Sequence, residues 1–162
     1  MKNIQYLFII FNALLILNSC SEDDKAELCP QNEVITMQIN GEVEEFDISG
    51  RGIELDTDGS GHTLVLYLFT GVFHPQQDSY AITVKLPYRR TGTNIIEEFS
   101  YFRVQNGISE ESDFVEGELE SEVIINTNSC FRATFSGRSI VDGNEIIISE
   151  GIINHIYDEP LR

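Results

Sequence analysis

Four residues in one short segment have the spacing of a metal-binding loop. They are Asp56, Asp58, Ser60 and Gly61. In the first half of an EF-hand loop, alternate oxygen ligands face a calcium ion and a glycine permits a sharp turn. The second half does not match, because the twelfth position is Tyr67, which has no carboxylate. A hairpin turn is the favoured interpretation and loose calcium binding the minor one. We expect no resident metal and no other cofactor.

The histidines do not suggest a catalytic or zinc site. His62, His74 and His155 are too far apart in sequence for one strand or helix to bring two of them together. Nucleophilic catalysis needs a serine or cysteine with a histidine and an orienting acid, and the sequence marks out no such set. We therefore expect a protein that is not an enzyme.

One segment has side chains suited to binding. Tyr88, Arg89 and Arg90 follow Pro87 at the expected end of a strand, where a loop would present them. Aromatic and arginine side chains are frequent anchors of binding interfaces. The alternative interpretation is that Tyr88 covers the edge of the core and the arginines balance the acidic surface. The segment remains a candidate binding site.

The amino terminus has the layout of a signal peptide. Lys2 precedes an apolar run over residues 6–17, and Asn18, Ser19 and Cys20 follow. The run is too short for a transmembrane helix, which needs roughly twenty apolar residues. We therefore expect residues 1–19 to be removed.

Residues 17–20, Leu-Asn-Ser-Cys, resemble the lipobox of bacterial lipoproteins. That resemblance implies a lipid on Cys20, whose two acyl chains would hold the protein to a membrane. An ordinary secretory signal is the alternative. The expected organisation is a signal peptide at 1–19, a lipidated acidic tether at 20–32, an all-β domain at 33–158 and a tail at 159–162.

An acidic cluster directly follows this cysteine. Residues 21–24, Ser-Glu-Asp-Asp, resemble the export signal of Bacteroidota lipoproteins exposed on the outer membrane, although a solvated tether would have the same composition. The chain has a formal net charge of −17, which disfavours contact with phosphate backbones. We expect an outer-membrane, cell-surface location and no nucleic-acid partner.

The two remaining cysteines form an even pair in a protein bound for an oxidising compartment. Cys29 and Cys130 are therefore predicted to form a disulfide. Its loop of about one hundred residues would contribute on the order of 4 to 5 kcal/mol in the chain-entropy model. Two buried free thiols are the alternative.

Alternation of apolar and polar residues predicts an all-β fold. About nine strands are expected, and they end at turn signals such as Asn40-Gly41, Asp142-Gly143 and Glu150-Gly151. The segment 109–117 is interpreted as a short helical turn or an acidic loop. An antiparallel β-sandwich is favoured over a flattened barrel. The expected strands cover residues 34–39, 43–48, 63–69, 80–86, 99–104, 122–126, 131–137, 145–149 and 152–157.

A family resemblance extends over the segments 131–137, 142–145 and 146–157, together with Ile39-Asn40-Gly41 and Phe46 near the start of the domain. These segments resemble those of a family of small Bacteroidota lipoproteins. It implies a fold and a location, and no functional residue. The sequence therefore predicts a lipid-anchored, non-catalytic module that binds or adheres to a glycan or a protein. The alternative is a periplasm-facing accessory subunit of an envelope complex.

Overall fold

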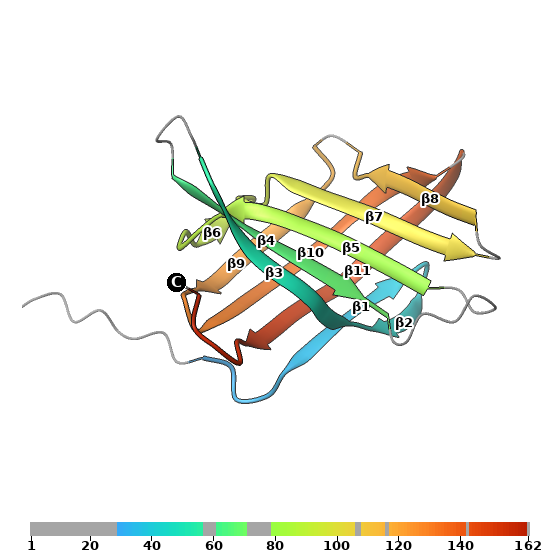
Figure 1. Ribbon diagram of the computed structural model, residues 1–162. Helices are drawn as coiled ribbons and strands as arrows, with labels where there is room; N and C mark the ends of the chain where they lie inside the picture. Colours follow the sequence, from blue (N-terminus) through green and yellow to red (C-terminus); the bar gives the residue numbers. More distant parts are fainter. Residues whose placement is uncertain are drawn as a thin grey trace, which may run out of the picture.

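The computed structural model describes residues 29–56, 61–70, 79–105, 108–115, 117–141 and 143–161, and these form strands without a helix (Figure 1). The strands are β1 (Val34–Ile39), β2 (Glu42–Glu45), β3 (Asp47–Leu55), β4 (His62–Phe69), β5 (Ser79–Pro87), β6 (Gly92–Thr93), β7 (Glu98–Gln105), β8 (Ile108–Asp113), β9 (Glu120–Asn126), β10 (Cys130–Val141) and β11 (Asn144–Ile156). The prediction of an all-β fold is confirmed.

Two antiparallel sheets pack face to face. One has the strand order β2-β1-β11-β10-β9-β6 and the other the order β3-β4-β5-β7-β8. Figure 1 shows the five-stranded sheet in front of the six-stranded one. The sheets do not close into a barrel, so the protein is a β-sandwich, as favoured from the sequence.

The core lies between the sheets because alternate residues of each strand point inward. On β4, Leu64, Leu66 and Leu68 are almost completely buried between the sheets. On the six-stranded sheet, the side chains of Phe131 and Ile153 point into the core and have no exposed surface. The strands are therefore fixed in register by the apolar residues that face the core.

The chain changes sheets where the sequence predicted one continuous strand. A single strand was expected over residues 43–48, but the chain forms β2 and β3, which belong to different sheets. Phe46 lies between them and is 5 % exposed, so its ring enters the core where the chain changes sheets. The rest of β3 escaped prediction because Gly50 and Gly52 interrupt its apolar pattern.

The interpretation of segment 109–117 as a helical turn or loop was wrong over its first half. Residues 108–113 form β8, which pairs with β7 from Ser100↔Asp113 to Gln105↔Ile108. β8 is an edge strand, and acidic residues on an edge strand discourage pairing with another chain. Backbone pairing with β7 accounts for a strand that has no apolar alternation.

The sequence suggested that Glu150-Gly151 separates two strands, but the two residues lie within one strand. β11 runs through this pair, and its pairing with β10 shifts register between Phe135 and Gly137. Glu150 has a φ of 50°. The predicted turn is therefore a β-bulge, which absorbs one residue while the strand continues.

Candidate functional site

A groove of about 740 Å³ crosses the outer face of the six-stranded sheet. It lies over four neighbouring strands, β6, β9, β10 and β11. Direct cross-strand pairs place Thr93 beside Glu122, Glu122 beside Thr134, and Thr134 beside Ile152. At a strand spacing of about 4.8 Å, this row is about 14 Å long. The groove is lined by Thr93, Asn94, Glu120, Ser121, Glu122, Thr134, Phe135, Ser136, Glu150, Gly151 and Ile152.

The β-bulge in β11 positions one wall of this groove. It gives Glu150 a left-handed backbone conformation, which is uncommon for a residue other than glycine. The carboxylate Oε2 of Glu150 accepts a hydrogen bond of 2.7 Å from Nε2 of Gln38 on β1. Bulges re-aim side chains and are frequent next to functional sites. The carboxylate is thus held at the groove margin by its backbone and by a neighbouring strand.

The opposite wall is fixed by Asn94. The backbone N–H of Asn94 donates to the carbonyl of Ser121 at 2.7 Å, and its Oδ1 accepts from the N–H of Ser121 at 2.8 Å. These two bonds extend the short pairing of β6 with β9. Asn94 also has a positive φ of 53°, which asparagine tolerates well. The groove is therefore preformed on both sides.

The groove offers carboxylate and hydroxyl groups as hydrogen-bonding partners. Glu120, Glu122 and Glu150 supply carboxylates, and Thr134 and Ser136 supply hydroxyls that both donate and accept. Among the described residues, its lining includes no lysine or arginine. Such a surface suits a neutral ligand rich in hydroxyl groups and repels an anionic one. None of these residues was identified from the sequence, because the groove depends on pairing between distant strands.

The predicted binding segment, Tyr88 to Arg90, forms an ordered loop after β5. The ring of Tyr88 is half-buried and packs against the core, and the guanidinium of Arg89 lies 5.2 Å from its centroid. The side chains of Arg89 and Arg90 are exposed. Nδ2 of Asn126 donates to the carbonyls of Pro87 and Arg90, each at 3.0 Å. The three residues are thus together in one loop, and they are not among the residues that line the groove.

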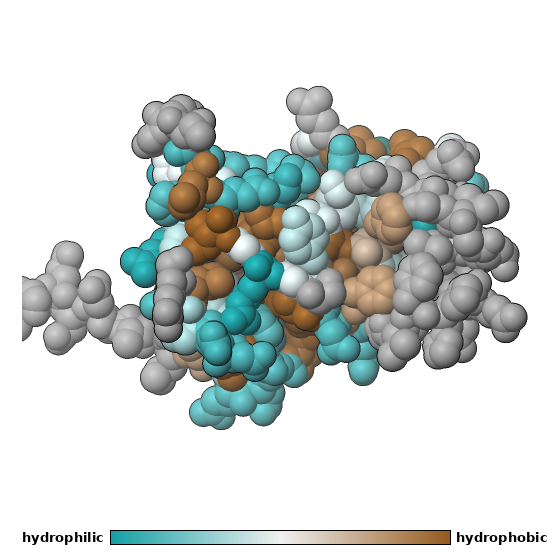
Figure 2. All heavy atoms as spheres, viewed as in Figure 1, coloured by the Kyte–Doolittle hydropathy of each residue, from teal (hydrophilic) through white to brown (hydrophobic). Residues whose placement is uncertain are grey.

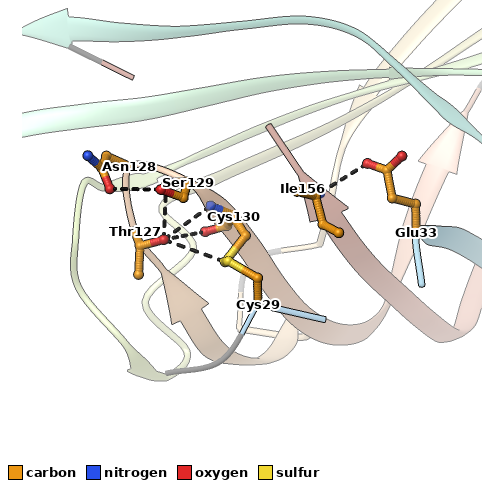
Figure 3. Close-up of a disulfide and its surroundings, with 7 residues drawn as sticks. All are labelled: Cys29, Glu33, Thr127, Asn128, Ser129, Cys130 and Ile156. Atoms are coloured by element: carbon orange, nitrogen blue, oxygen red, sulfur yellow. Dashed lines mark hydrogen bonds between the residues drawn. A yellow bond between two sulfur atoms is a disulfide. The ribbon is translucent and has the colours of Figure 1, made fainter. Parts of the chain in front are cut away.

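The predicted disulfide is confirmed. Cys29 and Cys130 are bonded, with their Cα atoms 5.7 Å apart and a sequence separation of 101 (Figure 3). Oγ1 of Thr127 accepts from the N–H of Cys130 at 3.1 Å and lies 3.6 Å from its sulfur. The N–H of Leu161 donates to the carbonyl of Asn128 in the same turn. The disulfide therefore holds the segment before β1 at the end of the sandwich where the chain also ends.

Contacts of Glu33 with β11 also stabilise this end of the sandwich. Nδ1 of His155 lies 2.7 Å from Oε1 of Glu33, which also accepts from the N–H of Ile156 at 3.0 Å. Burial lowers the pKa of His155, opposed by Glu33 and Asp158 and assisted by Arg51. Nε2 of His155 is buried without a hydrogen-bond partner in the described part of the chain. These contacts position the start of β1 against β11.

The metal hypothesis falls mainly outside the described residues. Asp56 and Gly61 are described, and the N–H of Asp56 donates to the carbonyl of Gly61 at 3.3 Å, as in a turn. Asp58 and Ser60 lie outside the described residues, as do His74, the predicted signal peptide at residues 1–19 and Cys20. Within the described ranges, no three His, Cys, Asp or Glu residues are grouped so as to hold a metal ion. The same ranges contain no helix long and apolar enough to span a membrane.

Comparisons with protein families, with curated proteins and with solved structures each found no match. The function must therefore be argued from the chain's own geometry.

Proposed function

We propose that this protein is a lipid-anchored, non-catalytic module that binds a neutral glycan in the groove of the six-stranded sheet. The observation that carries the proposal is the preformed groove of about 740 Å³, with hydroxyls and carboxylates on a rigid sheet. Carboxylates and hydroxyls accept and donate hydrogen bonds to sugar hydroxyls in fixed directions. Polar groups placed on strands rather than loops keep their geometry when the ligand is absent.

The groove favours a glycan over a protein ligand. Protein interfaces concentrate their binding energy in aromatic and arginine anchors, and the described residues of the groove expose neither. Phe135 contributes to its lining but is 4 % exposed. Glu120, Glu122 and Glu150 also disfavour uronic acids and sulfated sugars, because like charges repel across a partly desolvated site. The expected ligand is therefore a neutral oligosaccharide.

The groove can be blocked without disturbing the core. Thr134 lies in the middle of the cross-strand row, on the outer face of β10, so Thr134→Arg would fill the groove and leave the core intact. Thr36→Arg is the matched control, because Thr36 lies outside the groove on the same face, directly beside Ile152. A glycan array should show binding by the wild type and by Thr36→Arg, with loss in Thr134→Arg. Equal binding by all three proteins would refute the groove as the site.

The proposed anchor rests on the residues that resemble a lipobox, Leu17 to Cys20. At about 3.3–3.6 Å per residue, the chain from Cys20 to Cys29 spans at most about 32 Å. A lipid on Cys20 would therefore keep the disulfide-bearing end of the sandwich close to the membrane. The groove lies on the outer face of the six-stranded sheet, so a bound oligosaccharide would not have to fit between the domain and the membrane.

Location and lipidation are tested together on intact cells. Intact mass should show the diacylglyceryl group and the loss of residues 1–19, and Cys20→Ser should abolish both. Protease added to whole cells should release the domain if it is on the cell surface. Protection from protease would instead favour a periplasm-facing subunit, and crosslinking would then identify its partner.

A further inference from the structure

The disulfide joins the start of the described chain to a strand that lines the groove. Cys130 is the first residue of β10, and Thr134 and Ser136 of the same strand belong to the groove lining. At about 3.3 Å per residue along a strand, Thr134 lies about 13 Å from Cys130. Cys130 has no exposed surface, so this end of the bond is fixed in the core. The segment that leads to the proposed anchor is therefore covalently attached next to the groove.

β10 is a strong point of attachment. It lies inside the six-stranded sheet, between β9 and β11. Its pairing with β11 extends from Cys130 to Val141, and its pairing with β9 extends from Phe131 to Ser136. A pull on Cys130 along the strand therefore acts against backbone hydrogen bonds on both sides of β10. Many of these bonds must break before the strand can move.

β1 would be a weaker point of attachment, and without the disulfide it would be the first strand to receive a pull from the amino-terminal side. It has six residues, and beyond it the sheet ends in the four-residue strand β2. Gln38 of β1 donates the hydrogen bond that holds Glu150 at the groove margin. Tension on β1 would therefore act on the strand that supports one wall of the groove.

The disulfide also keeps the five-stranded sheet out of the covalent path between Cys29 and the groove. The strands β1 to β9 all lie between Cys29 and Cys130, which are 101 residues apart in sequence. They include the whole five-stranded sheet, which is in front in Figure 2, where hydrophobic residues gather in the middle of the view. While the bond is intact, a pull between Cys29 and β10 cannot extend any of these strands.

We propose that the disulfide between Cys29 and Cys130 is a force-bearing link between the groove and the membrane anchor. Force from a ligand in the groove enters β10, passes along it to Cys130, crosses the bond to Cys29 and leaves through the tether. The ligand is then a glycan fixed to a second surface, because only a held ligand develops tension. This inference rests on the proposed anchor and groove, and it adds adhesion under load to them.

The test is single-molecule force spectroscopy of the full chain, pulled between its amino terminus and position 134. Thr134→p-azidophenylalanine supplies the second attachment point, and Cys20→Ser in every protein leaves Cys29 and Cys130 as the only cysteines. With the disulfide intact, abrupt extension should not exceed about 14 Å, the reach of the chain from Cys130 to position 134. With Cys29→Ser and Cys130→Ser, unfolding should release about 350–380 Å at forces that the disulfide-bonded protein withstands.

A second pulling direction separates the path of the load from general stability. The same two proteins are pulled between position 134 and the carboxyl terminus, a path that does not cross the disulfide. Loss of stability alone lowers the unfolding force in both directions, because forced unfolding follows the unfolding rate. We expect the double serine variant to lose most resistance in the amino-terminal direction.

Three results would overturn the proposal. They are an equal loss of resistance in both directions, a long abrupt extension of the disulfide-bonded protein, and a double serine variant as resistant as that protein in the amino-terminal direction. The measurement needs neither lipid nor glycan. Its failure would therefore leave the proposed anchor and groove standing, and failure of glycan binding or lipidation would be seen in their own assays.

Discussion

The ring of Phe135 lies against Gly151, its direct partner on the neighbouring strand. A Cβ atom built on Gly151 would lie 2.5 Å from Cε2 of Phe135, which is closer than real contacts allow. Phe135 is 4 % exposed and packs against Phe99, so its ring cannot move aside freely. We expect Gly151→Ala to lower the free energy of unfolding by about 1–3 kcal/mol, the usual effect of overpacking a core. Urea denaturation of both proteins measures the difference.

Gly52→Ala is the matched control for this substitution. Both glycines lie within strands, but a Cβ atom on Gly52 meets open space. We expect Gly52→Ala to leave stability unchanged or to raise it by about 0.5–1 kcal/mol. Equal destabilisation by the two alanines would show that strand glycines here are not distinguished by their neighbours.

The sequence predicted those elements whose apolar alternation is clear. β1 and β5 each place apolar residues inward at alternate positions, and β4 has a run that is apolar on both faces. The predicted ranges of these three strands agree closely with the observed ones. β8 was missed because its side chains are polar and only backbone pairing with β7 defines it. Glu150-Gly151 was interpreted as a turn because the same residue pair suits both a turn and a bulge, and only the neighbouring strands decide which forms.

The candidate sites were much less accessible to sequence reasoning than the disulfide was. Cys29 and Cys130 could be paired by elimination, because lipidation of Cys20 would leave only two cysteines. Thr93 and Glu150, in contrast, line the same groove only because three strand pairings connect β6 with β11.

The disulfide should contribute strongly to stability. It closes a loop whose ends are 101 residues apart in sequence, and Cys130 has no exposed surface. We expect Cys29→Ser to lower the free energy of unfolding by about 4 kcal/mol, mainly because the unfolded chain gains freedom. Thermal denaturation with and without reductant should show the same loss in the wild type and no effect of reductant in the variant. Intact mass should rise by two hydrogens on reduction of the wild type.

The burial of His155 predicts a pH dependence of stability. Burial lowers the pKa of His155 in the folded protein, so the unfolded chain takes up this proton first as the pH falls. Stability should therefore be full above the ordinary histidine pKa of about 6.5 and decrease as the pH falls toward the lower folded value. His155→Gln should flatten the stability profile over this interval, as measured by urea denaturation at closely spaced pH values. An unchanged profile would assign the dependence to other groups.

In the loop after β5, we expect Tyr88 to contribute to stability, and Arg89 and Arg90 to matter only if the loop binds a ligand. Tyr88 is half-buried against the core, whereas the side chains of Arg89 and Arg90 are exposed. Replacing both arginines by alanine should change stability by no more than about 0.5 kcal/mol, as usual for surface positions. Replacing Tyr88 by alanine should cost more, because it removes a packed ring. If this loop is the ligand site, the double arginine variant loses glycan binding and Thr134→Arg keeps it, which is the reverse of the result expected for the groove.

Glu150 should show a conflict between stability and binding. Its left-handed backbone conformation costs about 1–2 kcal/mol for a residue with a Cβ atom, and glycine relieves that cost. Glu150→Gly should therefore stabilise the fold by about 1 kcal/mol, after the loss of the exposed bond from Gln38, and should weaken glycan binding. Glu150→Ala keeps the backbone cost and removes the carboxylate, so it should lose binding without gaining stability. Denaturation and glycan titration of the three proteins give both quantities. If Glu150→Gly bound glycan as tightly as the wild type, the carboxylate would have no part in the groove's function, and the bulge would serve only to continue β11.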